Sequence, residues 1–213
     1  MHSKTIHNLF PKPVAQYELN RNLTEKEILF VNNQETISNL GNSISKDKLV
    51  LESKELIEIK KFIEESVDDY FKTVYNPKHN VKLKITQSWI NCTKLNQYHH
   101  QHYHRNSIVS GVFYLKSDDQ TDRINFYKNT YEQINFLPKE WNVWNSDRWW
   151  ISVKTGLLII FPSYLMHSVS AVENNNANHV RTSLAFNTFA IGNIGDELYS
   201  DALHIGEIDG AFR

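Results

Sequence analysis

The sequence lacks the features that mark a secreted or membrane protein. It has one cysteine, Cys92, in 213 residues, which excludes an intramolecular disulfide framework, and we interpret Cys92 as a small buried hydrophobe. The apolar run Gly156–Phe161 stops after six residues, too few for a transmembrane helix. The first residues lack the apolar stretch of a signal peptide, so the expected compartment is the cytoplasm.

An excess of charge of one sign is also lacking. The chain has 23 Lys plus Arg against 24 Asp plus Glu, so no overall field favours nucleic acid or an anionic membrane, and we expect general binding to neither. The sequence contains no P-loop, glycine-rich dinucleotide fingerprint or serine elbow. Phosphoryl transfer and hydride chemistry are therefore disfavoured.

Histidine, by contrast, is concentrated in one place. Four of the ten histidines, His99, His100, His102 and His104, lie within six residues. Neutral imidazole is a common ligand of iron, zinc and copper, and side chains two apart on an extended segment point the same way. We choose His102 and His104 as the pair of ligands because they adjoin a β-like run, although His100 and His102 have the same spacing. The alternative to a metal site is that the cluster forms a solvated polar loop. A third ligand must come from elsewhere, and His167, just after an apolar run, is the best candidate.

A polar face follows on the next predicted strand. If residues 180–190 are extended, Arg181, Ser183 and Asn187 face the same side. Such a face is too polar for an ordinary core. It suits a barrel interior that holds a small anion, with a guanidinium to bind a carboxylate and a serine beside it. The alternative role for Arg181 is a surface ion pair. The alternative role for His167 is that of a core histidine bonded to a backbone carbonyl.

Three motifs together carry a family resemblance. They are His-x-His-x-Asn-Ser-x-x-Ser-Gly-Val-x-Tyr at 102–114, Gly-x-Leu-x-x-Phe-Pro-Ser-x-x-x-His at 156–167, and Arg-x-Ser-x-x-Phe-Asn at 181–187. The chain resembles a family of 2-oxoglutarate and iron(II)-dependent oxygenases of phages and bacteria, a His-x-His variant. The likeness also includes Ser88–Asn91 and Leu9–Pro11, so it spans most of the chain.

The resemblance implies a dioxygenase that hydroxylates a substrate, which the sequence does not disclose, while 2-oxoglutarate is oxidatively decarboxylated to succinate and CO2. Its cofactor would be Fe(II), and its cosubstrates 2-oxoglutarate and O2. His102, His104 and His167 would hold the iron, although the wider superfamily has a carboxylate where His104 stands. Arg181 and Ser183 would bind the far carboxylate of 2-oxoglutarate. Further candidate contacts to the cosubstrate are Asn91, Tyr114 and Asn187.

The expected fold is mainly β with N-terminal helices, a double-stranded β-helix (jelly-roll or cupin-like) barrel supported by two helices. We expect one domain over residues 1–213, with a lead-in and helices at 1–80, a barrel at 81–190 and a tail at 191–213 that is loop with at most one short helix. A capping box at Thr24 predicts a helix that reaches Ile37 or Leu40, and apolar spacing predicts another from Ser53 to Asn76. The predicted strands are Val81–Leu95, Ile108–Leu115, Ile124–Tyr127, Trp150–Val153, Leu157–Phe161 and Val180–Ala190.

Four of the five tryptophans lie between Trp141 and Trp150. Either this insertion folds back over the barrel, or Trp144 and Trp149 form a lid or stacking platform at a substrate mouth. Two other function classes stay open at this point. One is a cupin-like metalloprotein that acts as an isomerase or hydrolase, and the other is a non-catalytic β-barrel binding module.

Overall fold

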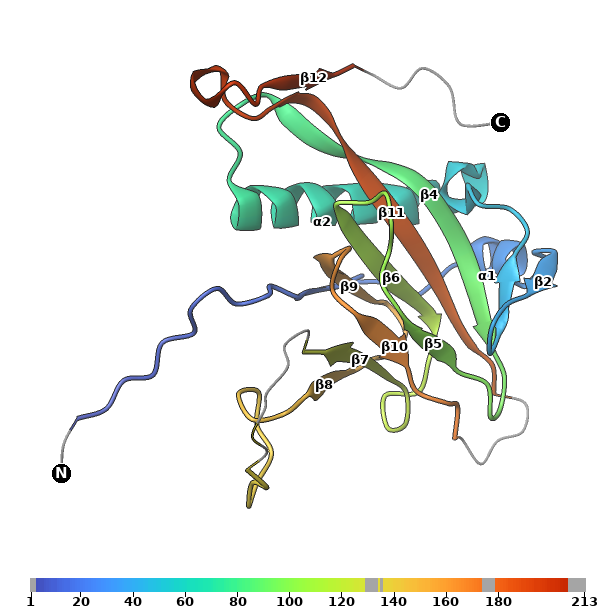
Figure 1. Ribbon diagram of the computed structural model, residues 1–213. Coiled ribbons are helices and arrows are strands. Elements are labelled where there is room, and N and C mark those ends of the chain that lie inside the picture. The colour runs from blue at the N-terminus through green and yellow to red at the C-terminus, as the bar shows by residue number, and fades with distance from the viewer. Residues whose placement is uncertain (1–2, 129–133, 135, 174–178, 207–213) are drawn as a thin grey trace.

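The computed structural model describes residues 3–128, 134, 136–173 and 179–206, and most of the regular structure in these ranges is antiparallel strand (Figure 1). The asparagine-rich segment 174–178, whose composition predicts a polar turn between two strands, lies outside the described residues. No helix within these ranges is long and apolar enough to cross a membrane.

Two antiparallel sheets pack with their inner faces together. Within the described residues, the strand order of the larger sheet is β1-β9-β6-β11-β4-β3-β2, with β12 paired to β11. The order of the smaller sheet is β5-β10-β7-β8. The strands of the larger sheet are β1 (Ala15–Glu18), β2 (Thr36–Ser38), β3 (Ser43–Ser45), β4 (Val81–Thr93), β6 (Val109–Lys116), β9 (Leu157–Pro162), β11 (Arg181–Ile194) and β12 (Leu203–Ile205). Those of the smaller sheet are β5 (His99–His102), β7 (Arg123–Tyr127), β8 (Arg148–Ser152) and β10 (His167–Val169). The predicted mainly β fold is confirmed.

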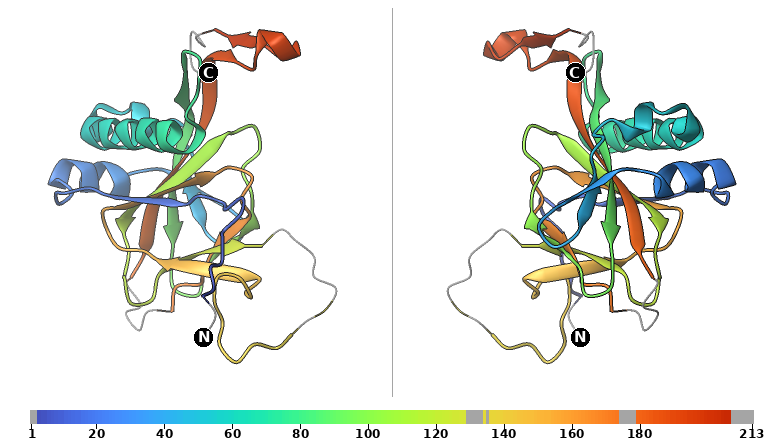
Figure 2. Two further views of the ribbon diagram at one scale, coloured as in Figure 1. Left: turned by 90° about the vertical axis from the view of Figure 1, so that its left-hand side faces the viewer. Right: turned by 90° about the vertical axis from the view of Figure 1, so that its right-hand side faces the viewer.

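Two α-helices lie on the outer side of the larger sheet (Figure 2). The capping box predicted for α1 (Glu25–Asn32) is present, since the Thr24 hydroxyl accepts from the Glu27 amide at 3.2 Å and the Glu27 carboxylate accepts from the Thr24 amide at 2.7 Å. α2 (Ile57–Tyr75) is amphipathic and buries one face against the sheet. That face consists of Ile59, Ile63, Val67 and Tyr70. Short 3-10 helices occur at Val50–Glu52, Lys54–Leu56 and Glu197–Tyr199.

The alternation predicted for the polar-faced strand is confirmed on β11. Leu184 and Phe186 belong to the core cluster shared with α2, whereas Ala185 belongs to the cluster between the two sheets. Because side chains alternate along a strand, Arg181 and Ser183 share the inner face with Ala185. The interior of the barrel therefore combines an apolar floor with a few buried polar groups.

Some element boundaries differ from the sequence-based prediction. The first helix ends at Asn32, short of Ile37, because Thr36–Ser38 pairs with Ser43–Ser45 as a hairpin that extends the larger sheet. The backbone of Gly41 has a φ of 90° in this turn, a conformation that glycine adopts without strain. The tail expected to be loop contains β12, which pairs with the far end of β11.

We expect the substitution Gly111→Ala to lower the free energy of unfolding by about 1–3 kcal/mol. A Cβ at this position of β6 would lie 2.4 Å from Cζ of Phe186 and 2.9 Å from the carbonyl oxygen of Ile159, so the core must shift to admit it. Urea denaturation measures the change. The control is Gly206→Ala, since nothing lies within 4 Å of the Cβ added there, and equal stability of the two variants would contradict the packing described.

Candidate metal centre

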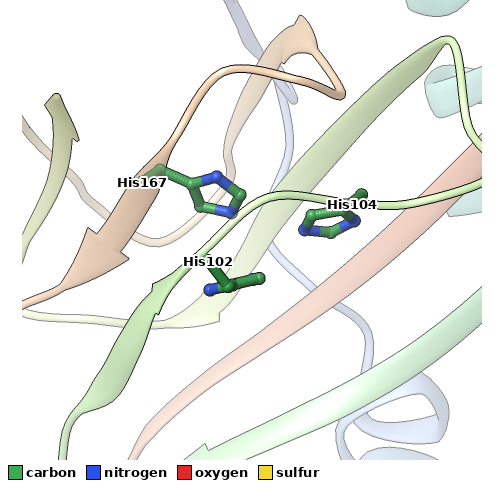
Figure 3. A group of neighbouring side chains, drawn as sticks. All are labelled: His102, His104 and His167. Carbon is green, nitrogen blue, oxygen red and sulfur yellow. The ribbon is translucent and has the colours of Figure 1, made fainter. Parts of the chain in front are cut away.

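Three histidines from two segments meet between the sheets, as Figure 3 shows. His102 ends β5 and His167 begins β10, and the two are directly paired in the antiparallel ladder, which brings their side chains together. The backbone amide of His104 donates to the carbonyl of Ser163 at 2.9 Å, which holds the segment after β5 beside the residues that precede β10. Each histidine offers one ring nitrogen, and these three atoms lie within 4.8 Å of one another.

The tautomer of each ring is set by a hydrogen bond at Nδ1. Nδ1 of His102 donates to the carbonyl of His100 at 2.8 Å, and Nδ1 of His167 donates to the carbonyl of Leu165 at 2.9 Å. Nδ1 of His104 donates to Oδ1 of Asn187 at 2.5 Å. Because Nδ1 carries the proton in every case, Nε2 of each ring keeps its lone pair, which is the arrangement that outer hydrogen bonds give to metal-binding histidines.

The rings are neutral over the ordinary pH range because they are buried. Burial lowers the pKa of His102 to about 4, with a further contribution from neighbouring histidines. Burial likewise lowers the pKa of His104, and that of His167 lies well below its usual value. A neutral imidazole is the form that binds a metal ion. The site therefore does not have to release protons before it takes an ion at pH 7.

The other cluster histidines pack beside this group without belonging to it. The ring centroids of His99 and His100 lie 4.5 and 5.0 Å from that of His102, but their ring nitrogens are not among the atoms close enough to share the ion. Nδ1 of His99 lies 3.4 Å from the side-chain nitrogen of Asn42, and Nδ1 of His100 lies 3.3 Å from the carbonyl of Leu40. Within the described residues, the set of ligand atoms close enough to share an ion is the one predicted from the sequence. No carboxylate belongs to it.

Arg181, predicted to bind the cosubstrate, is buried inside the barrel with 3% of its surface exposed. Its Nη1 donates to Oδ1 of Asp122 at 2.8 Å, and its Nη2 donates to the carbonyl of Ser170 at 2.8 Å. Asp122 also accepts from the amide of Asp118 at 2.9 Å and lies 3.3 Å from Nε2 of His179. Sequence reasoning missed Asp122, because it ends a polar loop and only the fold brings it to Arg181.

Two further predicted residues carry buried polar atoms without a partner in the described structure. The hydroxyl of Tyr114 and Oδ1 of Asn91 are both shielded from solvent and unbonded. Asn91 is paired with Ser183 on the neighbouring strand, and Ser183 with Tyr114 on the other side. Burial raises the pKa of the Tyr114 hydroxyl, so it stays protonated and is a donor. Such orphaned groups are uncommon in protein interiors, and a ligand or a water molecule can satisfy them.

The remaining predicted site residues have other surroundings. Asn187 contacts His104, the Ser110 hydroxyl at 2.9 Å and the Gln87 carbonyl at 3.0 Å, so its amide orients a histidine. Trp144 and Trp149 have 56% and 42% of their surface exposed, and neither lines the cavity beside the histidines. Their role at a substrate mouth stays a prediction.

That cavity has a volume of about 350 Å³ and opens beside β4. Trp89 stacks on His104 with ring centroids 5.8 Å apart and forms part of the wall. Lys48 and Gln87 also line it, and sequence reasoning missed both. Neither residue belongs to a recognisable motif, and Lys48 lies beside β4 only in the folded chain.

Replacement of Asn187 by Leu is expected to weaken binding of a divalent metal about 10–100-fold, because Nδ1 of His104 loses its acceptor and the ring its fixed tautomer. Isothermal titration with Zn(II) measures this. The matched control is Asn193→Leu on the same strand, whose Oδ1 accepts from Nδ1 of His204 at 2.7 Å outside the group of three histidines. Equal affinities in both variants would show that this hydrogen bond does not organise the site.

Comparison with known proteins agrees with this geometry. Residues 87–187 match the model of a family described as "Putative 2OG-Fe(II) oxygenase". No curated protein matches the sequence. Among solved structures, an oxidoreductase of the 2OG-Fe(II) oxygenase family from Burkholderia pseudomallei has 11% identity and a TM-score of 0.53, covering 76% of this chain and 74% of its own.

Two further structures share the fold. A prolyl-4-hydroxylase from Pseudomonas putida has 11% identity and a TM-score of 0.51 over 83% of this chain and 92% of its own. The epimerase SnoN, solved with Fe3+, alpha ketoglutarate and nogalamycin RO, has 11% identity and a TM-score of 0.57 over 95% and 89%. These similarities confirm the predicted double-stranded β-helix. The segment 87–187, which contains the three histidines and Arg181, belongs to the 2OG-Fe(II) oxygenase family, a family of oxidoreductases.

Proposed function

We propose that this protein is a 2-oxoglutarate and Fe(II)-dependent dioxygenase that hydroxylates an organic substrate and converts 2-oxoglutarate to succinate and CO2. The observation that carries the proposal is the convergence of three ring nitrogens from His102, His104 and His167 within 4.8 Å of one another, on rings whose Nδ1 atoms are each hydrogen-bonded elsewhere. In the proposal these three side chains hold the iron.

The donor set fits Fe(II). Imidazole nitrogen is a good ligand for this ion, and three protein ligands on one side leave coordination positions for other molecules. The rings are also held from outside, since Phe161 packs on His167 with centroids 4.6 Å apart and Trp89 packs on His104. Fixed rings keep the site from closing onto itself when no ion is bound.

The buried polar groups fit a dicarboxylate. The hydroxyl of Tyr114 can donate a hydrogen bond but has no acceptor among the described residues. Ser183 and Arg181 lie on the same inner face of the sheet. In the proposal these three side chains bind the far carboxylate of 2-oxoglutarate, with Asn91 beside them. Asp122 keeps the Arg181 fork fixed before the cosubstrate arrives, which reduces the entropy cost of binding.

Bound Fe(II), 2-oxoglutarate and O2 would together supply the oxidising chemistry, while the chain contributes position and exclusion of water. The histidines orient the ion, and the apolar inner cluster keeps the interior dry. The cavity that Trp89 and Gln87 help to line leaves room for a substrate. A metal-only hydrolase or isomerase would need neither the Arg181 fork nor the free hydroxyl of Tyr114.

Anaerobic addition of Fe(II) and 2-oxoglutarate to the protein is expected to give a visible charge-transfer band that neither component gives alone. The neutral double variant Asp122→Asn/Arg181→Gln retains a hydrogen-bonded pair in place of the buried ion pair, and we expect it to lose the band at the same concentrations while it still binds Fe(II). A single Arg181 variant would leave the buried Asp122 carboxylate without its guanidinium partner and destabilise the fold strongly, which would confound the result. Metal binding without any band in the unaltered protein would favour a cupin-like metalloprotein, and no metal binding would favour a binding module.

Tyr114→Phe tests the cosubstrate site without loss of a protein contact. Because the hydroxyl has no partner in the described structure, its removal is expected to leave the unfolding free energy unchanged or slightly raised, and to weaken 2-oxoglutarate binding about tenfold, as loss of a hydrogen bond to a charged group does. In the control, Tyr70→Phe, the hydroxyl that donates to the Pro13 carbonyl at 2.9 Å is lost. That variant should lose about 1 kcal/mol of stability and keep its 2-oxoglutarate affinity; the opposite pattern would refute the assignment.

A further inference from the structure

The cavity beside the histidines has a chemical character of its own. Its wall includes Lys48, Gln87, Trp89 and four histidines. Lys48 carries an ammonium group, and no residue of the wall carries a carboxylate. With a divalent ion on neutral histidines, the wall of the cavity would contribute no negative charge to balance the ion or the Lys48 ammonium.

The lysine is held in place by the strand beside it. The carbonyl of Lys48 accepts from the Ser88 amide at 2.7 Å, and the hydroxyl of Ser45 accepts from the Ile90 amide at 3.0 Å. The segment from 45 to 48 is therefore fixed along β4. As a result Lys48 lies next to Gln87 and Trp89, which both line the cavity.

The ammonium of Lys48 is only partly satisfied. Its Nζ donates to the Ser45 carbonyl at 2.5 Å, and within the described part of the chain it forms no ion pair with a carboxylate. Partial burial lowers the pKa of Lys48, and the carboxylate of the neighbouring Asp47 acts in the opposite direction without forming an ion pair among the described contacts. Lys46, two residues before Lys48, is exposed and forms an ion pair with Glu35 at 3.2 Å.

We propose that the substrate is an organic carboxylic acid whose carboxylate binds the Lys48 ammonium while its apolar part lies along Trp89 toward the histidines. The proposal rests on the proposed function for the reaction itself. One lysine with two remaining N–H groups suits a monoanion, whereas a phosphate is commonly held by a bidentate arginine or several donors. The amide nitrogen of Gln87 is a second donor, since only its carbonyl is used, by Asn187 at 3.0 Å, among the described contacts.

The size of the cavity limits the ligand. A volume of about 350 Å³ lies at the low end of the range for small-molecule sites. Ile44 and Trp89 provide apolar contact area in the same cavity wall as the ammonium and the histidines. A compact acid with a short hydrocarbon body matches this combination of charge and surface.

The test compares 3-phenylpropionate with its uncharged amide, 3-phenylpropanamide, as probes of the Zn(II)- and 2-oxoglutarate-loaded protein. In isothermal titration at low ionic strength, we expect the dissociation constant of the acid to be about tenfold lower than that of the amide. A charge-assisted hydrogen bond to Lys48 contributes a difference of this size. Lys48→Met should remove this preference and leave the amide unaffected. Lys46→Met, the matched exposed control, should keep it.

Each other result overturns the inference. Equal or undetectable binding of the two probes would do so, as would a preference that survives in Lys48→Met, because the acid would then bind the metal directly. A loss of 2-oxoglutarate affinity in Lys48→Met with unchanged probe binding would assign Lys48 to the cosubstrate. Failure of the proposed function is separately visible, since titrations with Zn(II) alone report the acid preference even if 2-oxoglutarate does not bind.

Discussion

The register of β11 between β4 and β6 is the constraint on which the site depends. It pairs Ser183 with Asn91 on one side and with Tyr114 on the other, and it sets Asn187 where His104 needs an acceptor. A shift by one residue would turn every one of these side chains to the face that packs on α2. The apolar residues of that outer face, Leu184 and Phe186, therefore fix the chemistry of the inner face, because their burial against the helix determines which residues point inward.

Charge balance inside the barrel follows from the same arrangement. Three neutral histidines leave the two positive charges of a bound Fe(II) uncompensated, whereas the wider superfamily places one carboxylate among the ligands. In the proposed complex the two carboxylates of 2-oxoglutarate supply that compensation. Arg181 adds no net charge, because Asp122 neutralises it at 2.8 Å. In that complex the cosubstrate and the metal would depend on one another, and Lys48 is left as the lysine in the cavity wall without a neutralising ion pair among the described contacts.

The sequence predicted the three histidines and the inward face of β11, because metal-ligand spacing and strand alternation are local patterns. It left the register within His99–His104 open, since only the pairing of His102 with His167 decides between equally spaced histidines. The short strands β5 and β10 escaped prediction because their polar residues have little strand propensity and owe their conformation to neighbouring strands. Asp122 and Lys48 could not be found either, as each reaches the barrel from a loop or turn far away in sequence.

The central claim is that a metal ion is held by three imidazoles and no protein carboxylate. X-ray absorption spectroscopy of the Fe(II)-loaded protein without cosubstrate tests it most directly, because outer-shell scattering from imidazole rings counts the histidine ligands. The account predicts three imidazoles, with one lost in each of the variants His102→Ala, His104→Ala and His167→Ala. Two imidazoles with a carboxylate, or a count unchanged in His104→Ala, would contradict it.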